Sequence, residues 1–165
     1  MKNPIGFFWH AHQSQLYPEL ARLESRGYVT SQVLEQQNRP DKRIYTISEA
    51  GRAALQQWVT QPPASVPERN ELLLKTYAIW LADPKQAIRL FHIEEDHHRT
   101  RLAQYEQILA QFEQKYGPKV PLDIPYFGDY ATLQRGISYE REYANWCRWM
   151  IEQLEANSNQ KGEEK

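Results

Sequence analysis

Residues 94–98, Glu-Glu-Asp-His-His, contain the spacing Glu-x-x-His twice. Residues three positions apart share one face of a helix, and di-iron four-helix proteins hold their metal with this spacing. Such centres draw carboxylates from all four helices, whereas the last helix of this chain offers Glu140 and Glu142 without a Glu-x-x-His of its own. The alternatives are a solvated patch or a polar break that fixes the register of an apolar seam. The sequence favours these alternatives and predicts no metal ion and no cofactor.

A single cysteine and two further histidines are the other residues with catalytic potential. Cys147 has no partner for an internal disulfide, and the pattern places no histidine on its helix face to activate the thiol. His10 and His12 lack a third ligand that the sequence places beside them. No Gly-rich phosphate loop, Gly-x-Ser-x-Gly elbow or His-Glu-x-x-His helix occurs. The sequence therefore predicts that the protein is not an enzyme.

Composition limits the class of protein further. The chain has 165 residues, of which 41% are hydrophobic and 25% charged, with a formal net charge of -1. These values predict a globular chain of one ordinary domain or two small ones and exclude a histone-like basic protein. The longest apolar stretch, residues 77–82, is far shorter than the roughly 20 residues of a membrane span, and the start lacks the pattern of a signal peptide. We expect no membrane partner and a cytoplasmic location, where a lone thiol stays reduced.

A short amphipathic helix is predicted over residues 13–27. Leu16, Leu20 and Leu23 recur at i, i+4 and i+7, which places them on one face of that helix. Gly27 is the residue type that commonly follows a helix end. The opposite face of the helix is polar and is expected to point to solvent or to a ligand.

A β-hairpin and a second helix are predicted next. Residues 28–36 are rich in Val and Thr, residues 44–47 alternate, and the turn-forming string 38–41 lies between them. Ser48 is expected to cap the following helix, because its hydroxyl can accept a hydrogen bond from the first turn. Helix, hairpin and helix form the later part of a winged helix-turn-helix domain, which we assign to residues 1–60.

In such a domain the first of these helices would lie in the major groove of DNA, and the hairpin tip would lie on the sugar–phosphate backbone. Glutamine can pair with adenine, serine can bond to several bases, and arginine and lysine reach phosphates. Residues 1–60 carry seven Lys and Arg against five Asp and Glu, whereas residues 61–165 carry thirteen against sixteen. The alternative is ordinary solvated surface. The residues predicted to contact DNA are His12, Gln13, Ser14, Gln15, Tyr17, Arg22, Arg39, Lys42 and Arg43.

Two strings in this half resemble the PadR family of bacterial transcriptional regulators. They are FFWHAHQSQLYPELARLESRGYVT and NRPDKRIYTISEAGRAALQQW. The positions that carry the resemblance are Phe8, Trp9, Gln15, Leu16, Tyr17, Leu20, Leu23, Glu24, Gly27, Arg39, Pro40, Tyr45, Ile47, Ser48 and Gly51. Together with the second half, the resemblance covers about residues 6–156. It implies a regulator that binds double-stranded DNA.

In the family, two further helices precede the Phe-Trp step, so the resemblance implies that the winged-helix domain is incomplete at its N-terminus. Either the true start lies upstream, or half of the DNA-docking unit has been lost. In the second case the apolar face of Leu16, Leu20 and Leu23 would need another partner. The alternative function is therefore a helical homodimer whose degenerate winged domain acts as a protein-interaction module.

The second half is expected to be helical. Residues 61–67 contain three prolines and are predicted to be a linker, residues 68–156 to form a dimerisation and effector domain, and the polar tail, residues 157–165, to be disordered. Three helices are expected, over residues 68–82, 84–116 and 129–156.

Both long helices carry apolar residues at steps of three and four, with a polar break at Glu95 and His98. The last helix is apolar over so wide an arc that it needs neighbours on two sides, which an antiparallel helix and a second subunit would supply. We therefore predict a homodimer. The residues expected at its contact are Phe91, Leu102, Tyr105, Leu109, Phe112, Ile137 and Ile151.

The chain contains twenty aromatic residues. The resemblance implies that some of them bind a flat aromatic effector between subunits, and Tyr143, Trp146 and Trp149 are the candidates. The fold class we expect is mainly α, of the α+β type: a winged helix-turn-helix domain followed by a long-helix antiparallel dimerisation domain. We expect a PadR-like repressor that binds a near-palindromic operator as a homodimer, with two recognition helices about one DNA turn apart.

Overall fold

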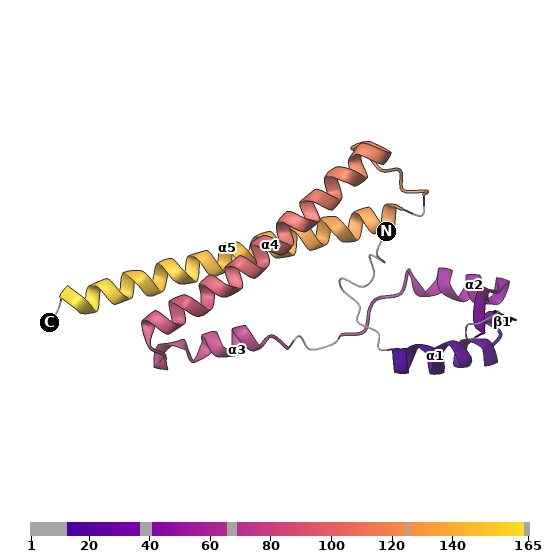
Figure 1. The fold of residues 1–165 in the computed structure, drawn as a ribbon, viewed down its shortest axis with the longest axis horizontal. Coiled ribbons are helices and arrows are strands. Elements are labelled where there is room, and N and C mark those ends of the chain that lie inside the picture. Colours follow the sequence, from indigo (N-terminus) through magenta and orange to yellow (C-terminus); the bar gives the residue numbers. More distant parts are fainter. Residues whose placement is uncertain (1–12, 37–40, 66–68, 125, 164–165) are drawn as a thin grey trace. The chain divides into compact units, whose positions relative to one another are not determined.

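The computed structural model describes residues 13–36, 41–65, 69–124 and 126–163. The chain divides into two compact units, residues 1–68 and residues 69–165. Helices dominate the described residues, and their β structure is one two-stranded sheet, so the predicted mainly α architecture is confirmed (Figure 1). None of the helices in these ranges combines the length and the hydropathy that a transmembrane span requires.

The first unit contains the predicted helix, hairpin and helix. Its elements are α1 (Gln13–Ser25), β1 (Val29–Leu34), β2 (Lys42–Ile47) and α2 (Glu49–Trp58). The two strands pair antiparallel, with Val29 opposite Ile47 and Leu34 opposite Lys42. The order of elements is that of the later part of a winged helix-turn-helix domain.

A glycine ends α1 and turns the chain directly into β1. Gly27 has a φ of 72°, in the left-handed region that glycine adopts without steric cost. The amide of Tyr28 donates to the carbonyl of Leu23 at 2.9 Å, and the amide of Gly27 donates to the carbonyl of Glu24 at 2.9 Å. These two bonds form a Schellman motif, so the predicted helix end at Gly27 is confirmed.

Ser48 connects the end of α1 to the start of α2. Its hydroxyl accepts a hydrogen bond from the amide of Gly51 at 3.0 Å, as a helix cap, and donates to the carbonyl of Gly27 at 2.6 Å. Gly51 is buried, and a Cβ at this position would lie 2.1 Å from the carbonyl oxygen of Tyr28. Because only glycine allows this approach, the spacing Ser-x-x-Gly in the sequence has a packing reason.

The second unit is built on two long helices. Its elements are α3 (Glu71–Tyr77), the 3-10 helix η2 (Ile79–Leu81), α4 (Pro84–Tyr116) and α5 (Phe127–Glu163). The predicted start of α4 is confirmed, because the carboxylate of Asp83 accepts from the amide of Gln86 at 3.0 Å and Pro84 is the first helical residue. The chain then reverses, so that α5 packs antiparallel to α4 (Figure 1).

Two helix boundaries differ from the expectation. The single helix expected over residues 68–82 is interrupted at Ala78, whose φ of -108° separates α3 from η2. The last helix continues to Glu163, so residues 157–163 are helical where a disordered tail was expected. A helix that is already nucleated extends through polar residues at little cost, because each residue adds a hydrogen bond without a new nucleus.

The residues predicted to form the dimer contact lie on α4 and α5, the two helices that pack on each other within one chain. The hydrophobic core of the second unit lies between α4 and α5 and contains Phe91, Cys147 and Ile151. Of the seven residues expected at the dimer contact, five are buried by this packing and two are half-buried: Phe91, Tyr105, Phe112, Ile137 and Ile151, and Leu102 and Leu109. These five side chains are part of the buried core of the second unit.

Candidate nucleic-acid interface and effector site

The polar face of α1 presents residues that were predicted to contact DNA. Ser14, Gln15 and Tyr17 are exposed within the first turns of α1, and Gln13 is the first residue of this helix. Their hydroxyl and amide groups both donate and accept hydrogen bonds, as base edges require. The predicted contacts His12 and Arg39 lie outside the described residues.

Basic side chains flank this face in the same unit. The Arg22 guanidinium, on α1, lies 3.5 Å from the carboxylate of Glu19, and both side chains are exposed. Arg43, on β2, lies 4.0 Å from Glu24, and Lys42 is exposed at the start of that strand. Exposed ion pairs contribute about 0–1 kcal/mol, so either guanidinium can exchange its carboxylate for a phosphate at little cost.

Glu24 holds the hairpin against α1, a role that the sequence did not reveal. The Ser31 hydroxyl, on β1, donates to Oε1 of Glu24 at 2.6 Å, and Arg43, on β2, approaches Oε2 of the same carboxylate. One carboxylate therefore connects the helix to both strands. Periodicity could not identify it, because its partners depend on which face of the hairpin each strand residue occupies.

In the second unit, Glu95 is buried between the two long helices and bonds to two arginines. Its Oε1 accepts from Nε of Arg99 at 2.7 Å and from Nε of Arg148 at 3.0 Å, and its Oε2 lies 2.8 Å from Nη2 of Arg148. Burial alone would raise the pKa of Glu95, but the two guanidinium groups outweigh burial and hold this pKa below its usual value. Glu95 is therefore a buried carboxylate that joins α4 to α5 as an anion.

A second polar group of residues lies beside it. His98 and Glu140 are both buried, with Nδ1 of His98 2.5 Å from Oε2 of Glu140, while Arg101 donates to Oε1 at 3.3 Å. The His98 ring stacks on Tyr143 with centroids 4.0 Å apart, and Nδ2 of Asn70, the cap of α3, donates to the Tyr143 hydroxyl at 3.1 Å. The polar break in the seam thus connects all three helices of the unit.

These contacts account for the repeated Glu-x-x-His spacing. Glu95 accepts hydrogen bonds from Arg99 and Arg148, and His98 is hydrogen-bonded to Glu140. In the ranges that the structure describes, no three His, Cys, Asp or Glu side chains converge as metal ligands would. The geometry therefore matches the interpretation of these residues as a polar break in the α4–α5 seam.

Cys147 is fully buried in the α4–α5 core. Burial, together with the nearby carboxylates of Glu94 and Glu95, raises the pKa of its thiol to about 11. The thiol therefore stays protonated near neutral pH and is a poor nucleophile.

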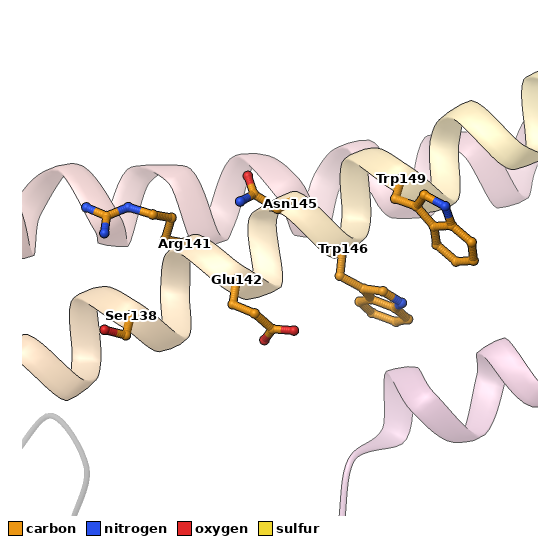
Figure 2. A pocket seen from close by; sticks show the side chains of 6 residues that line it. All are labelled: Ser138, Arg141, Glu142, Asn145, Trp146 and Trp149. Atoms are coloured by element: carbon orange, nitrogen blue, oxygen red, sulfur yellow. The ribbon is translucent and has the colours of Figure 1, made fainter.

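The three aromatic residues predicted to bind an effector line two different hollows. Trp146 and Trp149 line a hollow of about 440 Å³ along the outer side of α5. Figure 2 shows that all six residues lining it project from α5: Ser138, Arg141, Glu142, Asn145, Trp146 and Trp149. Tyr143 instead lines a hollow of about 320 Å³ beside α3, with Asn70, Lys75 and Glu94 among its other residues.

Family models match both units of the chain. Residues 1–57 match the PadR-like family of transcriptional regulators. Residues 68–155 match the family described as virulence activator alpha, C-terminal.

Known proteins of this type are similar over nearly the whole chain. The negative transcriptional regulator PadR of Bacillus subtilis is 27% identical over 157 residues, which are 93% of this chain and 85% of PadR. The crystal structure of that protein with operator DNA has a TM-score of 0.82 at 25% identity, covering 93% of this chain and 84% of the other. Its complex with p-coumaric acid has a TM-score of 0.75 at 26% identity, covering 93% and 85%.

A protein named as an activator is similar as well. The structure of the Vibrio cholerae virulence activator AphA has a TM-score of 0.67 at 29% identity, covering 93% of this chain and 84% of AphA. PadR and the PadR-like family are regulators of transcription, which agrees with the prediction that this protein is not an enzyme. The chain belongs to the PadR-like family of transcriptional regulators, and its second unit is of the virulence activator alpha type.

Proposed function

We propose that this protein represses transcription by binding a near-palindromic operator as a homodimer. The observation that carries the proposal is the first unit, where α1 exposes Ser14, Gln15 and Tyr17 and the hairpin adds Lys42 and Arg43. The similarity of the whole chain to operator-bound PadR supports this use of α1. The name of that relative, a negative regulator, supports repression.

In this proposal the residues divide by role. Gln13, Ser14 and Gln15 specify bases in the major groove, whereas Tyr17, Arg22 and the wing residues Lys42 and Arg43 position the protein on phosphates. His12 and Arg39 are proposed to join the first and second group, respectively. A homodimer places two such units on two half-sites, which is why the operator is proposed to be near-palindromic.

The direct test is a titration of the purified chain against labelled DNA from upstream of its own gene. We expect selective binding over an unrelated duplex of equal length, and an affinity that falls steeply between 50 and 200 mM salt. A reporter placed under the same promoter should show lower expression when the protein is present. Binding that does not distinguish the two duplexes would contradict the proposal.

We also propose that a small aromatic compound regulates the protein. The structure of the B. subtilis relative with p-coumaric acid supports this class of ligand. In this chain the hollow on α5 offers the indole rings of Trp146 and Trp149 for stacking.

Tryptophan fluorescence tests the effector proposal. Titration with p-coumaric acid should quench the emission, and Trp146→Phe with Trp149→Phe should abolish most of that change. The matched control is Trp58→Phe, an exposed tryptophan of the first unit. If the double variant responds like the native chain, the ligand binds elsewhere.

A second candidate function follows from exposed apolar side chains of the first unit. Leu16 and Leu23 of α1, Leu55 and Trp58 of α2, and Val59, which follows α2, are all exposed. An apolar surface of this kind commonly contacts another protein. The first unit would then be a protein-interaction module that does not bind DNA. In that case a Leu16→Ser, Leu23→Ser variant would lose binding to its protein partner.

A further inference from the structure

Two arginines that are proposed to contact phosphate lie beside carboxylates of α1, and these two carboxylates are held differently. The side chain of Glu19, which lies 3.5 Å from Arg22, is 63% exposed. The side chain of Glu24 is 36% exposed, and its Oε1 accepts a hydrogen bond from the Ser31 hydroxyl at 2.6 Å. Its other oxygen, Oε2, lies 4.0 Å from Nη1 of Arg43. Of the two carboxylates, Glu24 is therefore the one that the hairpin fixes in place.

The position of Glu24 is unfavourable for a carboxylate within its own helix. Glu24 lies in the last turn of α1, where the helix macrodipole is negative. A negative charge at this end destabilises the helix, so contacts outside the helix must compensate for it. Both strands of the hairpin supply such contacts, Ser31 from β1 and Arg43 from β2.

The strand register places Arg43 on the face of the hairpin that carries Ser31. Arg43 lies opposite Val33, and residues directly opposite each other on antiparallel strands share a face. Ser31 is two positions from Val33 on β1, so it occupies the same face. Lys42 is one position from Arg43 and occupies the other face. Of these two basic residues, Arg43 is thus the one on the face that meets Glu24.

A guanidinium group can bind a carboxylate and a phosphate at the same time. It has five N–H donors in a planar fork, and Glu24 lies beside only one end of the Arg43 fork. Because the Arg43 side chain is 51% exposed, a phosphate can approach the other donors. An arginine whose side chain is already ordered also loses less rotamer freedom when it binds DNA.

We infer that Glu24 is a positioning residue for DNA binding: its carboxylate, held by Ser31, orients the Arg43 guanidinium for its phosphate contact. This inference rests on the phosphate contact of Arg43 in the proposed function and adds the residue that acts through it. Because a phosphate carries no base identity, Glu24 contributes to the affinity for every duplex and leaves the discrimination between sequences unchanged.

Fluorescence anisotropy with Glu24→Gln tests the inference. Glutamine keeps an oxygen that can accept from Ser31 but removes the charge beside Arg43. We expect the Kd to rise about three- to tenfold for the duplex from upstream of the gene and for an unrelated duplex alike, as loss of one ordered side chain would give. The control is Glu49→Gln, which removes an exposed carboxylate of α2 in the same unit and should leave both Kd values within about twofold.

A double-mutant cycle with Arg43→Ala separates positioning from a general loosening of the hairpin. If Glu24 acts through Arg43, Glu24→Gln should change the Kd of the Arg43→Ala chain by less than about twofold. A loosened hairpin would also displace Lys42, so an effect of Glu24→Gln that persists in the Arg43→Ala chain overturns the inference.

Ser31→Ala is a second variant that retains both charges and frees the carboxylate from the hairpin. We expect its Kd to rise about threefold for both duplexes in the native background and by less than about twofold in the Arg43→Ala chain. Far-ultraviolet circular dichroism of each variant should match that of the native chain. A Ser31→Ala chain that is folded and binds DNA like the native chain contradicts the role of Ser31 in holding Glu24.

The outcomes separate this inference from the proposed function. A native chain that does not select the upstream duplex contradicts the proposed function. If the native chain is selective and Glu24→Gln binds as tightly or more tightly, the proposed function stands and the positioning role is overturned, because the carboxylate would then be neutral or compete with phosphate. Native affinity in Arg43→Ala likewise overturns the inference, because Glu24 would have no phosphate contact to position.

Discussion

At the scale of single residues, substitutions of Gln15 and of Arg43 are expected to have different effects on DNA binding. Gln15 can read a base, so Gln15→Ala should reduce discrimination at one operator position by about 1–3 kcal/mol and affect unrelated DNA little. Arg43 contacts phosphate in the proposed complex, so Arg43→Ala should weaken binding to all duplexes alike and reduce the salt slope by about one. Fluorescence anisotropy with matched and mismatched duplexes at several salt concentrations measures both effects. If the two variants behave alike, the division of roles is wrong.

Glu95 gives a prediction with a defined dependence on pH. Its pKa in the folded chain lies below the usual value of 4.5, so its contribution to stability is complete above about pH 4.5 and is lost as the pH falls through the folded pKa. Glu95→Gln should therefore be less stable than the native chain by about 1–3 kcal/mol at pH 7, because two charged hydrogen bonds are lost. The difference should shrink as the pH falls below about 4.5 and through the lower pKa of the folded chain.

Urea unfolding followed by circular dichroism at a series of pH values measures this difference. The control is Glu142→Gln, which changes an exposed glutamate on α5 and should show no such trend. A stability difference for Glu95→Gln that stays constant with pH would mean that its charge is not what holds α4 to α5.

At the scale of elements, Gly51 is expected to be the least replaceable residue of the winged-helix unit. A Cβ there would lie 2.1 Å from the Tyr28 carbonyl oxygen, so Gly51→Ala must push α2 away from the start of the hairpin. We expect a cost of about 1–3 kcal/mol, as for other overpacked sites. Hydrogen exchange of the β1 amides measures it, because local opening of the hairpin sets their rate.

The control for this substitution is another helical glycine. At Gly128, in the first turn of α5, a Cβ would meet nothing within 4 Å. Gly128→Ala should therefore be neutral or stabilise its helix by up to about 1 kcal/mol. Equal protection of β1 in the native chain and in Gly51→Ala would contradict the packing argument.

The elements also show where local sequence signals suffice. Gly27, Ser48 and the Asp83-Pro84 pair mark helix ends correctly, because capping bonds join residues at most five positions apart. The extension of α5 to Glu163 was not foreseen, because polar residues permit both a helix and a disordered chain. The interruption at Ala78 likewise carries no glycine or proline to announce it.

At the scale of the whole molecule, a dimer with two DNA-reading units should measure the spacing between half-sites. Inserting five base pairs between the half-sites rotates one of them by about half a turn, so the affinity should fall by at least about tenfold. Inserting ten base pairs returns the two half-sites to the same face of the DNA and should recover part of the lost affinity. Mobility-shift titrations with the three operators test this, and equal losses for both insertions would argue against a dimer of defined geometry.

Residue patterns predicted some features of the candidate sites and missed others. The exposed positions of Ser14, Gln15 and Tyr17 followed from the polar face of one helix, which depends on local periodicity. The role of Glu24 did not, because its bonds to Ser31 and Arg43 require the strand register. Three aromatic residues on one helix were expected to share a pocket, yet Tyr143 faces α3 and His98 while Trp146 and Trp149 line another hollow.

The sequence by itself determined the order of elements, their caps, the PadR-like resemblance and the polar break in the long-helix seam, because each depends on neighbouring residues or on a fixed period. Only the tertiary structure decided on which helix the apolar seam of α4 packs. A heptad pattern is the same whether the helix packs on its own chain or on a second one, and here α5 covers Phe91 and Phe112 within the chain. It also decided that Glu95 pairs with Arg148, 53 residues away, because such a contact exists only once the two helices are aligned.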